Sequence, residues 1–228
     1  MIPLNSYEGL TSRLNVICPK RLNRCLVGLL FADPGHDLTK KELIPFINRF
    51  NLRSQDFTHF FFAGYVVERE THLYRDCVFV TAGPGGLKWY FSAKAFENIR
   101  RDFETITKWQ FSGGVDLVLV DAIRQQSEWG TTKFILNFDE AVSINLIAAR
   151  DDKLIPSLSE FFEPLFRNAE TPGQSPIYAV SDNQVRVICT SVAKALVKHF
   201  LSKEAVVEFE KSKVLAVRNL SRPGLFNA

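Results

Sequence analysis

The sequence predicts an α/β fold, a mixed β-sheet with flanking helices, from three consecutive features. Residues 25–32 form an almost unbroken apolar run, which is typical of a strand buried on both faces. A polar turn follows at residues 33–37, and Thr39 and Glu42 then have the Thr-x-x-Glu spacing of a helix capping box. Ligands in open α/β sheets bind just past the carboxyl ends of strands, so this turn is the first candidate for a functional site.

Patterns further along the first half predict two helices and a second strand. A short helix or arm is expected at residues 7–16, a helix at residues 40–53 and a strand at residues 57–67. Apolar residues at three- and four-residue spacing predict the second helix, and Pro45 in its second turn kinks it or delays its start. Aromatic and β-branched residues predict the strand.

A glycine-rich segment at residues 83–86 predicts a β-hairpin. Its two strands are expected at residues 77–82 and 87–91. Ser92 then precedes a predicted helix that extends to about residue 108, with phenylalanine and isoleucine side chains along one side.

The second half predicts another buried strand, a second hairpin and a second capping box. The strand is expected at residues 115–123, and the hairpin pairs residues 133–138 with 141–149 across an acidic turn, Asp139 and Glu140. A capping box at residues 157–160 begins a helix that is expected to end near residue 166. Beyond it we expect a loop at residues 168–176, a helix at 181–202, and a helix or a strand pair at 204–220.

With 228 residues, the chain suits one large domain, or one domain with a helical appendage. Apolar residues make up 46% of it and phenylalanine occurs 20 times, so a substantial core is available. We divide the chain into an N-terminal arm at 1–24, an α/β core domain at 25–168, a C-terminal helical part at 177–220 that packs on the core, and a flexible tail at 221–228.

The order of predicted elements, without the first hairpin, resembles the β-α-β-α-β-β-α order of thioredoxin-like domains. The resemblance rests on topology alone and implies no function. The thioredoxin dithiol would fall near residues 34–37, where this chain has no cysteine. Thiol redox catalysis is therefore not expected.

The net charge of +3 is small and does not predict a nucleic-acid partner. No charged-then-apolar leader is present at the N-terminus. The longest apolar run after the first strand, residues 60–67, is too short to span a bilayer. We therefore expect a soluble, cytoplasmic protein without a membrane partner.

The four cysteines form no C-x-x-C pair; they are Cys18, Cys25, Cys77 and Cys189. Neither a zinc knuckle nor a local dithiol motif is therefore predicted. Cys25 and Cys77 lie in apolar strands and are expected to be small core residues. His59 alternates with aromatic residues in a predicted strand, which favours a structural role.

Four polar residues are the candidates for catalysis: Asp33, His36, Asp37 and Asp121. Asp33 and Asp121 each end an apolar run. If their strands are parallel neighbours, the two carboxylates emerge at one sheet edge and could hold Mg²⁺ against a phosphate. Aspartate is also a common turn former and favours a helix N-terminus, so turn formation and capping are the favoured interpretation.

The three tryptophans are the candidates for a binding surface: Trp89, Trp109 and Trp129. Each lies beside a predicted hairpin or helix end, with a basic residue nearby. Such residues are enriched at interface hot spots and also stack on bases. Use in the core is the favoured interpretation.

Three hypotheses for the function follow. The leading one is a non-catalytic protein-protein interaction subunit or adaptor, with a protein partner or a second copy and no cofactor. The second is a metal-dependent phosphoryl-transfer or hydrolytic enzyme that uses Mg²⁺ and the four candidates above. The third is a nucleic-acid-binding accessory protein, which would use a basic cluster at residues 13–24 and the C-terminal lysines.

Overall fold

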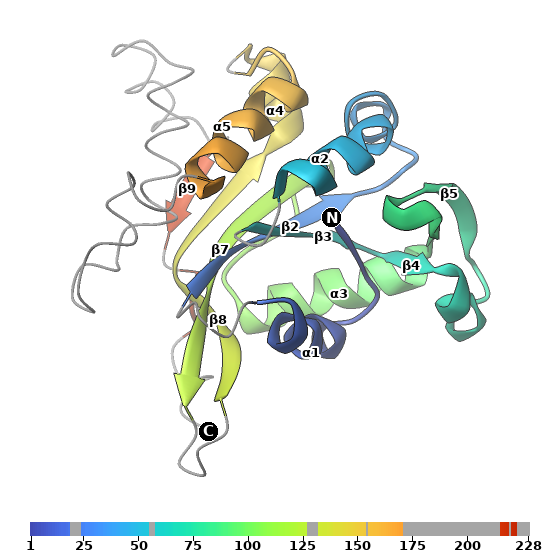
Figure 1. Ribbon diagram of the computed structural model, residues 1–228. Coiled ribbons are helices and arrows are strands. Elements are labelled where there is room, and N and C mark those ends of the chain that lie inside the picture. The colour runs from blue at the N-terminus through green and yellow to red at the C-terminus, as the bar shows by residue number, and fades with distance from the viewer. Residues whose placement is uncertain are drawn as a thin grey trace.

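The fold is an α/β arrangement with one large and one small β-sheet (Figure 1). The computed structural model describes residues 1–18, 24–54, 58–126, 132–153, 155–170, 215–218 and 220–222. The large sheet has the order β1-β3-β2-β7-β8-β9, with bounds Ile2–Leu4, Thr58–Ala63, Arg24–Ala32, Val115–Gln126, Thr132–Asn145 and Leu215–Arg218. β1 and β2 run parallel to β3, whereas β7, β8 and β9 each run antiparallel to the strand before them in this order. The predicted mixed sheet is confirmed, and the thioredoxin-like order stays a prediction.

Helices cover both faces of the large sheet (Figure 1). They are α1 and α3 on one face and α2 and α5 on the other, with bounds Tyr7–Ile17, Ala93–Ile106, Ile47–Ser54 and Leu158–Glu170. On the first face, the ring centroid of Phe31 in β2 lies 5.6 Å from that of Phe103 in α3. On the second, the centroid of Phe60 in β3 lies 5.2 Å from that of Phe162 in α5. Two aromatic layers therefore form the core, one on each side of the sheet.

The predicted helix at residues 40–53 is confirmed, but its first half is irregular. A π-helical turn, Thr39–Leu43, and a 3₁₀ turn, Ile44–Phe46, precede α2. Pro45 has no N–H to donate, which is why regular α-helix begins only at Ile47.

The predicted capping box at Thr39 is wrong. The helical segment begins earlier, where Leu38 N donates to His36 Nδ1 at 3.2 Å and Lys40 N donates to the His36 carbonyl at 3.0 Å. Thr39 is consequently inside the first turn and fully buried. Glu42 does not reach back, because its carboxylate accepts from Arg150 at 2.9 Å.

The strand predicted at residues 57–67 is divided by Gly64. β3 ends at Ala63, Gly64 has a φ of +82°, and β4, Tyr65–Val67, joins the small sheet. A Cβ atom at Gly64 would also come within 2.9 Å of the Phe96 Cα atom. Both the positive φ and this close approach therefore require glycine at this position.

The small sheet has the order β4-β6-β5 and contains the predicted first hairpin. β5, Val78–Ala82, and β6, Lys88–Phe91, flank a 3₁₀ turn at Pro84–Gly86. Another 3₁₀ segment, Glu68–Leu73, connects β4 with β5. The helix predicted after Ser92 is confirmed as α3, and the Ser92 side chain caps it by accepting from Ala95 N at 3.0 Å.

The predicted hairpin around Asp139 and Glu140 is wrong. β8 is one strand that pairs antiparallel with β7 on both sides of these residues. Leu119 pairs with Val142 and Asp121 with Asn137, so residues 138–141 form a bulge opposite a single residue of β7. The expected strand end at 146–149 is instead α4, Leu146–Asp151. The Asn145 side chain caps α4, and a short apolar run fits a helix as well as a strand.

The first and last helices of the described residues, α1 and α5, confirm two predicted elements. α1 confirms the helix at residues 7–16, and α5 begins where Glu160 N donates to Ser157 Oγ at 3.1 Å. α5 extends to Glu170, into the expected loop at 168–176, and the rest of that loop and the helix at 181–202 lie outside the described residues. Within 204–220, β9 pairs with β8.

The division of the chain into four parts stays a prediction. No helix in the described residues is long and apolar enough to cross a membrane.

Candidate functional site

The turn after β2 uses its polar residues to form the turn itself. Asp33 Oδ1 accepts from Gly35 N at 2.6 Å, and the Asp33 carbonyl accepts from His36 N at 3.0 Å. His36 Nδ1 in turn accepts from the backbone at the start of the helical segment. This is the turn-forming and capping interpretation of these residues.

Asp37 lies at the exposed start of the same helical segment. Its carboxylate pairs with Lys41, one helical turn further on, at 2.8 Å. This hydrogen bond and the positive charge of Lys41 lower the pKa of Asp37. Asp37 therefore stays ionised, which suits a surface ion pair rather than a general acid.

Asp121 does not lie near this turn. β2 and β7 are antiparallel, so the premise of a shared sheet edge is wrong. Asp121 pairs with Leu26 and is buried, whereas Asp33 follows Ala32 at the other end of β2. Six residues of strand separate these two ends, about 20 Å at 3.3 Å per residue. One Mg²⁺ ion cannot bind both carboxylates, since its ligands lie at about 2.1 Å.

Two of the tryptophans belong to the core. Trp89 is 1% exposed and Trp109 is 3% exposed. The Trp89 ring packs 5.7 Å from that of Phe62 and lies against Gly83, where a side chain would overlap its indole. The ring centroid of Trp109 lies 4.3 Å from that of Phe31. Neither indole is open to a partner or a base in this structure, and Trp129 lies outside the described residues.

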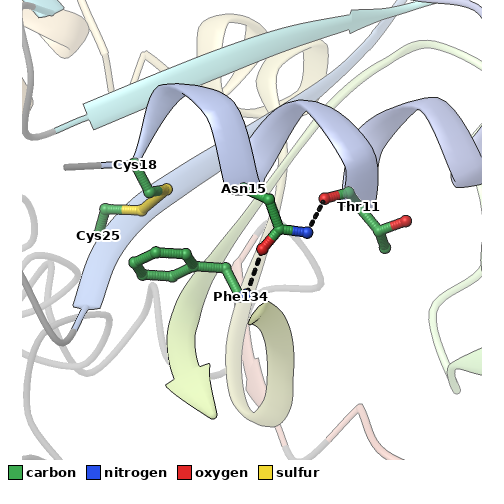
Figure 2. Close-up of a disulfide and its surroundings, with 5 residues drawn as sticks. All are labelled: Thr11, Asn15, Cys18, Cys25 and Phe134. Carbon is green, nitrogen blue, oxygen red and sulfur yellow. Dashed lines mark hydrogen bonds between the residues drawn. A yellow bond between two sulfur atoms is a disulfide. The ribbon is translucent and has the colours of Figure 1, made fainter. Parts of the chain in front are cut away.

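Cys18 and Cys25 form a disulfide between the end of α1 and the start of β2 (Figure 2). Their Cα atoms are 6.6 Å apart and both residues are 2% exposed. Cys25 is in the core, as expected, but as one half of this disulfide, whereas Cys77 is only half-buried. A usable signal is present in the sequence, because one cysteine follows the predicted helix at 7–16 and the other begins the next strand.

His59 in β3 lies on the same face of the sheet as Cys25. It pairs with Val27, two residues after Cys25, and alternate residues of a strand point to the same side. The two sulfur atoms and one ring nitrogen of His59 all lie within 4.8 Å of one another. All three side chains are buried, so the cluster is enclosed by the core.

Hydrogen bonds fix the helix that carries Cys18. Asn15 Oδ1 accepts from Phe134 N in β8 at 2.7 Å, and Asn15 Nδ2 donates to the Thr11 carbonyl at 3.0 Å (Figure 2). Cys18 N donates to the Leu14 carbonyl at 3.0 Å and ends α1. The position of Cys18 relative to the sheet is thus set by contacts outside the cluster.

A second candidate is the outer edge of β5 with the exposed side chains of Val78, Phe79 and Leu87, which we call the β5 surface. These side chains are 65%, 55% and 58% exposed. Across the part of the chain that is described, no strand pairs with this edge (Figure 1). No charged residue occurs between Asp76 and Lys88.

Comparisons with known proteins identify no relative: no family model, no curated protein and no solved structure matches the chain. The two candidates therefore have to be judged on their chemistry alone.

Proposed function

We propose that this protein is a non-catalytic assembly subunit that joins to a second copy of itself along the β5 surface. The observation that carries the proposal is an apolar, uncharged edge strand with no buried residue of its own. The four catalytic candidates give no comparable support for an enzyme. Asp33, His36 and Asp37 form the turn and the exposed start of the helical segment, and Asp121 lies far from them.

An open strand edge promotes pairing with another chain. Its N–H and C=O groups need partners, and proteins usually protect such an edge with lysine, proline, bulges or a covering segment. β5 has one of these devices, a bulge between Phe79 and Thr81, and its carbonyl at Ala82 accepts from Asn48 of α2 at 3.5 Å. The edge before the bulge, at Val78 and Phe79, is protected neither by the bulge nor by the hydrogen bond from Asn48.

The side chains add a hydrophobic contribution at the same place. Val78 and Phe79 are consecutive, so they point to opposite faces of β5, and both are more than half exposed. Phe79 is held in position by an edge-to-face contact with Tyr90 at 5.6 Å. A preformed aromatic side chain at an edge is typical of an interface anchor.

The occupant that fits best is a second copy of this chain. An uncharged apolar strand offers no charge for a partner to complement, and an identical strand has the same apolar character. Antiparallel pairing about a two-fold axis also keeps the two Asp76 carboxylates at opposite ends of the joint. Each Asp76 carboxylate also accepts from Ser92 Oγ at 2.7 Å and from Lys94 N at 2.9 Å, which holds it at the N-terminus of α3.

The test is the mass of the protein in solution, measured by light scattering after size exclusion. We expect the wild-type chain to be a dimer and Val78→Lys, as well as Phe79→Lys, to be monomeric with unchanged circular dichroism. Both side chains are exposed, so the lysine does not disturb the core. Leu52→Lys is the matched control, because Leu52 is a 75% exposed apolar residue on α2, and this variant should remain a dimer.

Two results would contradict the proposal. One is a wild-type chain that stays monomeric up to high protein concentration. The other is a dimer that persists in both lysine variants, which would place the interface elsewhere on the molecule.

A further inference from the structure

The cluster of Cys18, Cys25 and His59 has the composition of a metal site. It is the one group of three metal-ligating side chains that converges within the described ranges. Cys18 follows α1 and Cys25 lies at the start of β2, seven residues further on, whereas His59 comes from β3 and is brought beside them only by the pairing of β2 with β3. Their convergence in a buried place therefore calls for a chemical explanation beyond local structure.

The spacing of the donor atoms suits a tetrahedral zinc site. Zinc binds thiolate sulfur at about 2.3 Å and imidazole nitrogen at about 2.0–2.1 Å, which places neighbouring donors roughly 3.5–3.8 Å apart. The three donors here already lie within 4.8 Å of one another. Once the sulfur–sulfur bond is broken, the two sulfur atoms need only move apart to reach those distances.

The donor types and the burial both favour this class of ion. Two thiolates and an imidazole select zinc or a similarly soft ion over Mg²⁺ and Ca²⁺, which prefer oxygen ligands. Two thiolates with one divalent cation have no net charge, and a neutral imidazole adds none. A buried, uncharged unit avoids the cost of placing an isolated ion in the core.

We propose that the reduced chain binds one zinc-class divalent ion through Cys18, Cys25 and His59, and that the disulfide is the oxidised, metal-free form of this site. In the reduction, a small thiol supplies two electrons to the sulfur–sulfur bond. The bond breaks, both sulfurs bind the ion as thiolates, and two molecules of the small thiol become one disulfide and release two protons. A water molecule or an anion completes the four-coordinate site.

Cobalt(II) is the probe for the test, because its visible absorption reports tetrahedral coordination and its ultraviolet absorption reports bound thiolate. The full chain is reduced, freed of reductant and titrated without oxygen. We expect one cobalt ion per chain, with both absorption features, and displacement of cobalt by zinc. Treatment of the zinc form with a thiol oxidant should release one zinc ion for every two thiols lost.

Two pairs of variants separate a three-ligand site from a simple dithiol. His59→Gln and Cys18→Ser should each weaken cobalt binding by more than about 100-fold, beyond the effect of losing an outer-shell partner. The matched controls are His72→Gln and Cys77→Ser, since His72 is exposed and Cys77 is the free cysteine of the described residues. Both controls should bind as the wild type does.

Circular dichroism of the reduced, metal-free proteins shows which variants fold. His59→Cys provides a second test at this position, because it keeps a metal ligand and should restore binding with stronger thiolate absorption. The proposal is overturned if the folded, reduced wild type binds no cobalt. It is also overturned if His59→Gln binds cobalt with wild-type affinity, which would leave only a dithiol pair.

Discussion

β2 and β5 resemble each other in sequence and differ completely in their surroundings. The apolar runs that form them both begin at a cysteine, Cys25 and Cys77, and both are short. Every residue from Cys25 to Ala32 is buried, whereas β5 has no buried residue. β2 lies between β3 and β7 in the large sheet, and β5 is the outer strand of the small one (Figure 1).

The difference shows that position in a sheet, more than composition, decides what an apolar strand contributes. A central strand is hydrogen-bonded on both sides and covered on both faces, so its side chains stabilise the fold. An edge strand leaves one row of backbone groups and part of its side chains available to another molecule. β2 therefore serves the core and β5 is the candidate for assembly.

The largest expected effect comes from one substitution made in both strands. Phe31→Ala in β2 should lower the free energy of unfolding by about 3–5 kcal/mol, because a fully buried ring is replaced by a cavity. Phe79→Ala in β5 should change it by less than about 0.5 kcal/mol, since this ring is 55% exposed. Urea unfolding at low protein concentration, where the chain is monomeric, measures both values.

Equal losses in the two variants would break the comparison. Such a result would mean that Phe79 is buried in the folded monomer, and it would remove the apolar anchor from the β5 surface. A small loss for Phe31→Ala would instead mean that the rings around it close the cavity. The neighbouring rings to examine then are those of Phe103 and Trp109.

A smaller effect is expected at Gly28 in the middle of β2. Gly28 pairs with Phe60 of β3, and a Cβ atom at Gly28 would overlap the Phe60 ring. Gly28→Ala should therefore cost about 1–3 kcal/mol by overpacking. Gly85→Ala, in the turn next to β5, has open space around its Cβ and should cost about 1 kcal/mol, because its φ of +70° disfavours a side chain.

A second substitution separates these two causes. Phe60→Leu in the Gly28→Ala background should recover part of the loss, since the smaller side chain removes the overlap. A double-mutant cycle from urea unfolding measures this coupling. Phe60→Leu combined with Gly85→Ala should give additive losses, and additivity in the Gly28 cycle would contradict the packing explanation.

Local sequence patterns were sufficient for most of the elements. The apolar run of β2, the helix after Ser92 and the glycine turn before β6 each depend on residues that are close in the chain, and each prediction is confirmed. The errors arose where a distant contact decides the outcome. Asp139 and Glu140 have the character of a turn, but pairing with β7 on both sides makes them part of a bulge.

The candidate sites were less predictable for the same reason. A sequence shows which residues end a strand but not the direction of its neighbour. The convergence of Asp33 and Asp121 requires parallel strands, and β7 runs antiparallel to β2. The cluster at Cys18 needed the pairing of β2 with β3, which brings His59 to Cys25. The exposure of Phe79 likewise depends on the place of β5 in its sheet.

The smallest expected effect concerns Asp116, a buried carboxyl that pairs with Phe31 across the β2–β7 ladder. Burial raises the pKa of Asp116, and the hydrogen bonds from Ser112 N and Oγ oppose this only in part. A raised pKa means that the folded state binds the proton more tightly than the unfolded state does. The contribution of Asp116 to stability therefore falls as pH rises from the unfolded value of 3.8 through the folded pKa.

Asp116→Asn removes this titration and can keep both contacts with Ser112. The asparagine carbonyl oxygen can accept from the Ser112 backbone N–H, and its amide N–H can donate to the Ser112 hydroxyl. We expect the variant to be more stable than the wild type at pH 7 and to lose this advantage as the pH approaches 4. Thermal unfolding at a series of pH values measures the difference, with the exposed Asp152→Asn as the control. A difference that does not change with pH would mean that the carboxyl is equally protonated in the folded and unfolded states, and burial beside Phe31 would then not shift its pKa.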